Sequence, residues 1–388
     1  MKITLIRVIV AMGALLTALT GCRSEYRSSS VEWIKSKDLR TGNEIWQITS
    51  HDSISEAFYF YVSSVTSDDK YVIFRSKRSG GFDIYRSNLI NGEITRLTDE
   101  GIKDACIHSD GKNMVYISGW KYYKMNVQTM ERELVLDFTG KLPSKPAFRP
   151  SLTNDGRYTI VFTRQNDTNS LYRVNLETKE ILKVMEQAGG SFSHQLINPA
   201  DPDLITYNPL PDTQNDNSLP MEKRPRTRII NIKKGTNEPF LITPYGLRAT
   251  HDSWSSGGDR YYFFEKNQKG WIPASVGSID LNGDDYTRHY TNDTIKLGHG
   301  TISRDTRWFI SDGQKPDDNP LILINLQDKK GKIICWPDAS VDPPANVHVH
   351  PNFSSSGNFI IYTSDVVKTG THQVYVVPIK VIKDSWHL

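Results

Sequence analysis

A pattern of short apolar strands and polar turns returns along the chain after residue 25. Each copy has an apolar strand, a Ser/Asp/Gly turn, an aromatic or β-branched strand, a strand with Tyr or Ile, and a further strand. "VTSDDKYVIFRSKRSGGFDIYRSNLINGEITRLT" is the first of seven copies and "FSSSGNFIIYTSDVVKTGTHQVYVVPIK" is the last. The turns return at intervals of roughly 40 to 57 residues, the range of four-stranded propeller blades. Long helical patterns are absent, so the pattern predicts an all-β fold.

The first and last copies complete one another. Little sequence follows "VYVVPIK", so the seventh copy lacks a good fourth strand, whereas "TGNEIWQITS" (Thr41 to Ser50) looks like a fourth strand with none before it. Ring closure would join the two and remove the open edges of the sheets. We therefore predict one domain over residues 41–388, a seven-bladed β-propeller closed by the N-terminal strand. An open β-sandwich array is the alternative.

The N-terminal segment is typical of a processed leader. Lys2 and Arg7 precede an apolar run from Val8 to Leu19, which is short for a membrane span, and small residues then lead to Cys22. "LTGC" resembles the lipobox of bacterial lipoproteins, in which the cysteine is lipidated; an uncleaved anchor helix or a chance match is the alternative. We expect a signal peptide over residues 1–22, a linker over residues 23–40, and a lipoprotein of the bacterial cell envelope, in the periplasm or at the outer-membrane surface.

Composition narrows the choice of partners. The chain has 388 residues, of which 37% are hydrophobic and 23% charged, so a sizeable core is expected. The net charge of +3 is too small to argue for a nucleic-acid partner. Membrane contact is expected only through the N-terminal lipid. Cys106 and Cys335 lack metal-ligand spacing and would be either free and buried or joined in a disulfide.

Histidines recur at one register of the predicted blades. When the copies are aligned on the hydrophobic residue before each turn, the position three residues earlier holds histidine in the last four copies, Arg149 in the third and Asp104 in the second. In a propeller this strand is the innermost one, so these side chains would share a ring around the axis. His348 lies two residues before the last of them and would face the same way. The four aligned histidines are His194, His251, His299 and His350.

Such a cluster suits metal chemistry. Three neutral imidazoles hold a divalent ion and leave coordination positions open, and His299, His348 and His350 are the natural triplet. His251 would then stay free as an acid or base. Arg228 begins a strand of the fourth copy and is expected to point over the channel mouth. A single histidine in a strand is usually a half-buried packing residue, but four at one register in consecutive copies favour a functional cluster.

Several stretches are similar to one known family. "EAFYFYVSSVTSDDKYVIF", "SHQLINPADPDLITY", "TRIINI" followed by "THDSW", and "HVHPNFSSSGNFIIYTSD" resemble segments of the oligogalacturonate lyases. These are seven-bladed propellers that cleave short pectic fragments by β-elimination. The resemblance covers nearly the whole mature chain.

The resemblance implies roles for individual residues. His299, His348 and His350 would bind a divalent metal, manganese in the family, and His251 would abstract the proton. Arg228 would stabilise charge or bind substrate. The sequence departs from the family at two places. Ala345 stands where the family has a glutamine metal ligand, so Asn346 or water would have to substitute for it. "YNPLP" (Tyr207 to Pro211), followed by a polar insert, replaces a family motif. The residues expected to hold sugar carboxylates are His194, Arg149 and Arg226.

The expected function is metal-assisted β-elimination of acidic, uronate-containing oligosaccharides to 4,5-unsaturated products. Glycoside hydrolysis would need two carboxylates at the site, and only Asp104 lies in the ring register. Two alternatives remain. One is the same chemistry on another uronate glycan, such as ulvan or rhamnogalacturonan fragments. The other is a non-catalytic propeller, similar to TolB-type envelope scaffolds, that binds glycan or protein.

Overall fold

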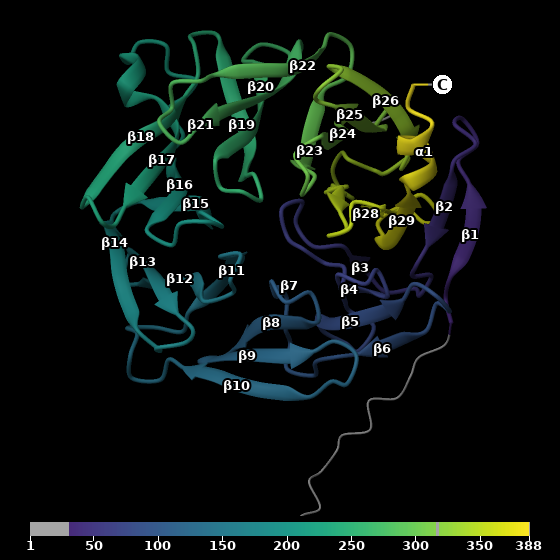
Figure 1. Cartoon of the computed structure of the whole chain (residues 1–388), viewed down its shortest axis with the longest axis horizontal. Coiled ribbons are helices and arrows are strands. Elements are labelled where there is room, and N and C mark those ends of the chain that lie inside the picture. Colours follow the sequence, from purple (N-terminus) through teal and green to yellow (C-terminus); the bar gives the residue numbers. More distant parts are fainter. Residues whose placement is uncertain (1–30, 316–317, 388) are drawn as a thin grey trace, which may run out of the picture.

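Seven β-sheets stand around one axis (Figure 1). The computed structural model describes residues 31–315 and 318–387, and within these residues six sheets have four strands and one has five. The strands within each sheet are antiparallel, and the strand before the polar turn lies nearest the axis in each blade (Figure 1). The predicted seven-bladed β-propeller is confirmed. Helical structure in the described residues is confined to α1 (Lys380–Asp384) and a 3-10 turn, η1 (Met221–Lys223).

The strands follow one another from the axis to the rim in each of the first six blades. Blades one to three contain β3 (Ser55–Glu56), β4 (Tyr71–Ser76), β5 (Asp83–Asn88), β6 (Ile94–Arg96); β7 (Ala105–Ile107), β8 (Asn113–Ser118), β9 (Lys121–Asn126), β10 (Arg132–Asp137); and β11 (Ala147–Leu152), β12 (Tyr158–Gln165), β13 (Thr168–Asn175), β14 (Ile181–Ala188). Blades four to six contain β15 (Ser191–Ile197), β16 (Leu204–Leu210), β17 (Pro225–Asn231), β18 (Thr236–Ile242); β19 (Leu247–Trp254), β20 (Arg260–Asn267), β21 (Ala274–Asp280), β22 (Thr287–Asn292); and β23 (Leu297–Ile302), β24 (Trp308–Gly313), β25 (Leu321–Asn325), β26 (Lys330–Cys335).

Blade seven joins the two ends of the chain. It consists of β27 (Asn352–Phe353), β28 (Phe359–Ser364), β29 (Gln373–Pro378), β2 (Glu44–Gln47) and β1 (Ile34–Lys37). β2 pairs with β29, so the purple N-terminal strands lie beside the yellow C-terminal ones in Figure 1, and the predicted closure is confirmed.

The fifth strand, β1, lies inside the segment predicted to be a linker over residues 23–40. All four of its residues are exposed, so no apolar alternation signalled it in the sequence. The folded sheet therefore begins earlier than expected. The predicted signal peptide, including Cys22, lies outside the described residues.

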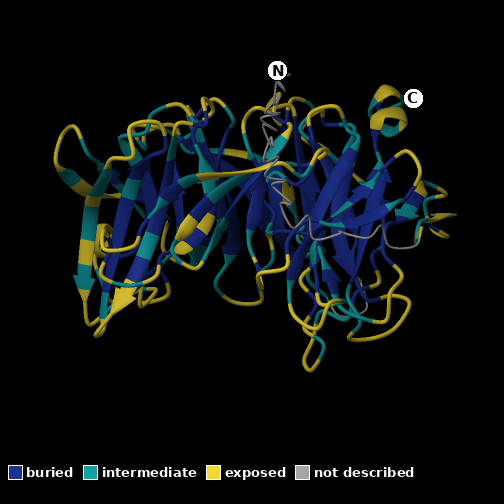
Figure 2. Cartoon of the chain, turned by 90° about the horizontal axis from the view of Figure 1, so that it is seen from below, coloured by how far each residue is buried: buried dark blue, intermediate teal, exposed yellow. Residues whose placement is uncertain are grey.

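The core lies between neighbouring blades. β24 and β25 are buried along their whole length because each face is covered by an adjacent blade, whereas the rim strand β14 has no buried residue. Figure 2 shows dark blue through the middle of the blades and yellow at the turns. Cys106 and Cys335 are both buried and free, which decides between the two expected states of these thiols. Among the described residues, no helix has the length and apolar character needed to cross a membrane.

Candidate functional site

The inner strands are distorted at the histidine register. His194, His251 and His350 adopt left-handed backbone conformations, with φ of 50°, 51° and 47°. The ladder of β15 with β16, and that of β19 with β20, shifts register around the first two. Bulges of this kind redirect a side chain away from the regular alternation of a strand. The same local distortion thus turns histidines from different blades toward the axis.

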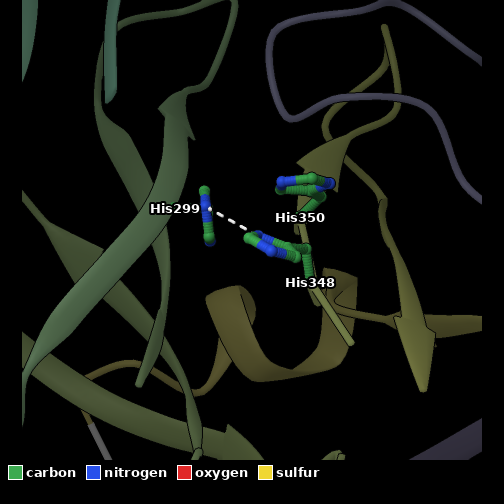
Figure 3. A group of neighbouring side chains, drawn as sticks. All are labelled: His299, His348 and His350. Carbon is green, nitrogen blue, oxygen red and sulfur yellow. Dashed lines mark hydrogen bonds between the residues drawn. The ribbon is translucent and has the colours of Figure 1, made fainter. Parts of the chain in front are cut away.

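Four imidazole rings converge on this side of the hub. Ring centroids are 4.1 Å apart for His251 and His299 and 4.4 Å apart for His299 and His350. His348 lies 5.1 Å from His299 and 5.2 Å from His350. In Figure 3, His299 faces the other two labelled histidines across the gap between blades six and seven. The convergence predicted from the register is present.

Asp312 sets the orientation of His299. Its carboxylate accepts the His299 backbone N–H at 2.6 Å and lies 3.1 Å from the His299 Nδ1 atom. Burial raises the pKa of Asp312 to about 7, while the backbone N–H of His299 acts in the opposite direction. A carboxylate behind one ring nitrogen directs the other nitrogen to a metal.

The sequence around His299 permits this close contact. A Cβ on Gly298 would lie 2.3 Å from an Asp312 oxygen, and a Cβ on Gly300 would lie 1.9 Å from the carbonyl oxygen of Ile310. Any larger residue at either position would push β24 away. "GHG" is therefore the local sequence that lets the carboxylate reach both the backbone and the ring of the histidine.

His299, His348 and His350 fit a divalent metal ion. One ring nitrogen from each lies within 4.8 Å of the other two. The Nδ1 atom of His348 is 3.4 Å from the Nε2 atom of His299, and the Nε2 atom of His350 is buried with no hydrogen-bond partner in the described structure. His348 is exposed, so the group is open to a ligand from solvent. Ala345 offers no ligand atom, so an ion here would need water or substrate oxygen to complete its coordination.

His251 stands next to this triplet with an unused nitrogen. Its Nδ1 atom is buried and has no hydrogen-bond partner among the described residues. Burial lowers its pKa well below the ordinary value, and His299 and Lys266 add to this effect. The ring is therefore neutral at pH 7, as a proton acceptor must be.

Arg226, rather than Arg228, points toward the histidines. The Nε atom of Arg228 donates to the Asn237 side chain at 3.0 Å on the rim strand β18, so its predicted place over the channel mouth is wrong. Arg226 donates through Nε and Nη2 to Asp252 at 3.0 and 2.8 Å. In a regular strand, Arg226 and Arg228 would lie on the same face. The pairing of β17 with β18 shifts register on both sides of Thr227, so the two arginines point in different directions.

Asp252 ties this arginine to the strand that carries His251. It is fully buried and accepts hydrogen bonds from Arg226, Thr227, Asn208 and Tyr261. Burial raises its pKa, but the Arg226 cation and the hydrogen bonds outweigh burial and hold the value at about 2. The carboxylate is thus charged and its ion pair is closed.

A cavity of about 280 Å³ adjoins the histidines on the side of blades one to four. Arg149 is exposed there, and Asp104 lies 3.9 Å from Arg75, so charges of both signs line the space. His194 borders the cavity and its Nε2 atom is 3.0 Å from the Tyr59 hydroxyl. Burial lowers the pKa of His194 to about 4. The predicted binding residues Arg149 and His194 therefore share one cavity, while Arg226 lies near His194 behind Asp252.

Tyr59 and Phe60 were not among the predicted site residues. The Tyr59 ring lies 4.5 Å from His350, and the fully buried Phe60 ring lies 5.8 Å from His251. They come from the loop after β3, so blade one covers the cluster with aromatic rings where other blades supply histidines. The run "FYFY" was the available signal, because four aromatic residues in a row do not fit the apolar and polar alternation of a strand.

Comparisons with known proteins agree with this fold. No protein-family model and no curated protein matches the chain. An oligogalacturonate lyase solved in complex with manganese has a TM-score of 0.76 at 18% identity, with 91% of this chain and 97% of that chain covered. The oligogalacturonate lyase from Vibrio parahaemolyticus has a TM-score of 0.75 at 18% identity, covering 91% and 98%. A chain of a mitotic checkpoint complex reaches a TM-score of 0.52 at 10% identity, covering 97% and 98%.

These matches define the class of fold. The chain is a seven-bladed propeller of the kind found in oligogalacturonate lyases, and the expected structural resemblance is confirmed. Identity of 18% shows the shared fold and does not by itself assign an activity.

Proposed function

We propose that this chain is a metal-dependent lyase that cleaves uronate-containing oligosaccharides, of the oligogalacturonate type, by β-elimination. The observation that carries the proposal is the triplet of His299, His348 and His350 beside the neutral, unpartnered ring of His251. A divalent ion, manganese by analogy with the structural neighbour solved with manganese, suits the nitrogen ligands. When bound, it would act as a Lewis acid on a substrate carboxylate.

The reaction needs a base and a polarised carboxylate. In a 4-linked uronate the C5 proton is acidic because it is α to the C6 carboxylate. The Nδ1 atom of His251 would accept this proton, and the electron pair would form the C4–C5 double bond as the C4–O bond breaks. The departing sugar oxygen takes up a proton from water, and His251 returns the C5 proton to solvent, which leaves one 4,5-unsaturated product and one new chain end.

The charged residues around the histidines would bind and orient the sugar. Arg226 is held in place by Asp252 and would interact with the sugar from there, and Arg149 would bind a sugar carboxylate in the cavity. Burial raises the pKa of Tyr59 far above its usual value, so its hydroxyl stays protonated as a donor. His194, neutral at pH 7, would accept or donate a hydrogen bond to a sugar hydroxyl.

The cellular setting belongs to the same proposal. A lipid on Cys22 would tether the enzyme to the cell envelope, where acidic oligosaccharides arrive from outside, and no nucleic-acid partner is proposed. An enzyme that acts on another uronate glycan, or a propeller that binds glycan without cleaving it, would use the same fold.

Two measurements test the function. Metal analysis of the purified protein should show one divalent ion per chain. Incubation with oligogalacturonides and Mn²⁺ should raise the absorbance at about 230 nm, where unsaturated uronates absorb. If only ulvan or rhamnogalacturonan fragments were cleaved, the lyase chemistry would stand and the proposed substrate would be that glycan instead. Retention of metal with no absorbance change on any uronic oligosaccharide would contradict lyase activity and favour a binding scaffold.

A further inference from the structure

A lysine lies between blades five and six beside the histidines. Side chains alternate along β20, so Lys266 shares a face with Phe264 and Tyr262. Those two rings pack against Phe309 and Leu297 of blade six. Lys266 is the last of the three toward the end of the strand, and it pairs with Arg248, which lies three residues before His251 on β19. Lys266 is therefore near the histidine cluster along the sheet, and it adds to the effect of burial in lowering the pKa of His251 and His299.

The Lys266 side chain forms no salt bridge with any residue that the structure describes. The residue is fully buried, and its Nζ atom has no hydrogen-bond partner among the described residues. The Trp271 ring, whose centroid is 4.5 Å from Nζ, is half-buried and covers it. A buried charge without a partner is costly, so such a group indicates a ligand or ion that completes it. Asp312 is the acidic residue in electrostatic range, but its carboxylate is already bonded to His299.

A second cation faces Lys266 directly. Arg248 is its cross-strand partner in the pairing of β19 with β20, so both side chains lie on the same face. The Nε atom of Arg248 is also buried without a hydrogen-bond partner in the described structure. Its Nη2 atom is 3.3 Å from Asp212, in the polar insert after β16, so that carboxylate balances one of the two charges. Like charges placed opposite each other destabilise a sheet, and burial together with Arg248 lowers the pKa of Lys266 to about 7, so a bound anion would stabilise its charged form.

We propose that Lys266 and Arg248 form a carboxylate-binding site between blades five and six, which holds an acid group of the sugar bound at the histidines. The carboxylate would take the place of the Trp271 ring over the ammonium and accept hydrogen bonds from Lys266 Nζ and Arg248 Nε. This inference rests on the proposed action on uronates, and it extends that proposal by adding a second acid-binding position across the cluster from Arg149. It also gives the polar insert a role, since Asp212 of the insert holds Arg248.

Binding of a small acid tests the site without requiring catalysis. The probes are D-galacturonate and its uncharged analogue D-galactose, titrated calorimetrically into the manganese-loaded full chain. Lys266→Met removes the charge and keeps the volume, and Lys269→Met removes an exposed charge on the same hairpin as the matched control. We expect Lys266→Met to weaken galacturonate binding by about 10- to 100-fold, with galactose binding and the Lys269→Met variant unchanged.

Metal affinity separates this site from a purely structural role. If Lys266 served only to balance Asp312, Lys266→Met would weaken manganese binding and leave the ratio of galacturonate to galactose affinity unchanged, and that result would overturn the proposal. Manganese affinity that is unchanged or higher, together with a lost preference for the acid, would support it.

The outcomes for the two proposals are distinguishable. If the wild-type chain binds galacturonate through Lys266 but releases no unsaturated product from any uronic oligosaccharide, the acid site stands and the lyase proposal fails. If Lys266→Met binds galacturonate as tightly as the wild type while both release unsaturated product at the same rate, the lyase proposal stands and the acid site fails.

Discussion

The inner strands of blades two and three differ from those of blades five to seven, although they occupy equivalent places around one hub. Blades two and three present Asp104 and Arg149, which border an open cavity and keep their charges near solvent. Blades five to seven present His251, His299 and His350, which are packed ring against ring, and His251 and His350 each have a buried nitrogen without a partner in the described structure. The equivalent position of the inner strand therefore holds charged side chains near solvent in blades two and three, and neutral rings that fit a metal in blades five to seven.

This difference indicates that burial, more than strand register, decides whether a side chain at the axis is charged or neutral. Histidine loses its charge when it is buried, and the neutral ring is both a ligand and a base. Arginine keeps its charge and needs either solvent or a carboxylate, and Arg226 is ordered in the buried half only because Asp252 accompanies it. Under the proposed function, the histidine half would hold the metal and the base, and Arg149 in the other half would bind an acid group of the sugar.

The largest expected effect comes from His299→Ala, which removes the central ring of the buried half. We expect loss of bound manganese and a fall in lyase activity of about a thousandfold or more, because Lewis-acid assistance supplies several kcal/mol of transition-state stabilisation. Metal analysis and absorbance assays measure both quantities. His289→Ala is a matched control in a rim strand, and equal losses in both variants would show that unfolding, not metal loss, is responsible.

His251→Ala should separate the base from the metal ligands. Loss of a general base lowers kcat by about 100- to 10,000-fold, while manganese content should remain at the wild-type level. Metal analysis of the variant decides the assignment. If the variant loses its manganese, His251 is a ligand and one of the other rings is the base.

Arg226→Met tests the buried ion pair of Arg226 with Asp252. Leaving Asp252 buried and unpaired should lower the free energy of unfolding by about 3–5 kcal/mol. Arg228→Met, two residues away but directed to the rim, should change it by no more than about 0.5 kcal/mol. Urea unfolding of the two variants measures the contrast, and a similar small loss in both would mean that the pair with Asp252 is not formed.

Arg149→Met tests recognition in the solvated half. Removing an exposed cation from the cavity should raise KM for oligogalacturonides by about tenfold and leave kcat nearly unchanged, because the charge binds ground state and transition state alike. Steady-state kinetics at fixed manganese concentration distinguish the two parameters. A fall in kcat with constant KM would place Arg149 at the reacting centre instead.

A smaller effect is expected from the pH dependence of stability at His194, which lies between the two halves. Its pKa is about 4 in the folded chain, below the ordinary value of 6.5, so the unfolded chain binds more protons between these values. The free energy of unfolding should therefore fall as the pH drops from 6.5 to 4. Since the side chain is half-buried, about 1 kcal/mol of this fall should disappear in His194→Asn. Identical pH profiles of thermal unfolding for variant and wild type would contradict this.

The sequence by itself determined the propeller and the position of the histidines around its axis. The repeat of strand and turn specifies blades because each sheet has to bury both faces against a neighbour, and the incomplete first and last copies specify closure. A shared register places His194, His251, His299 and His350 on the inner strands, since equivalent positions of equivalent blades face the same axis.

Only the tertiary structure decided which charged residues join them. The bulge at Thr227 directs Arg226 inward and Arg228 to the rim. The alternation of apolar and polar residues in the sequence does not predict where a bulge occurs. Asp312, Lys266 and Tyr59 reach the cluster from second strands and a loop, so their nearness depends on how blades pack and not on spacing along the chain. Secondary structure follows from local pattern, whereas the partners of a buried charge are set by contacts between segments far apart in sequence.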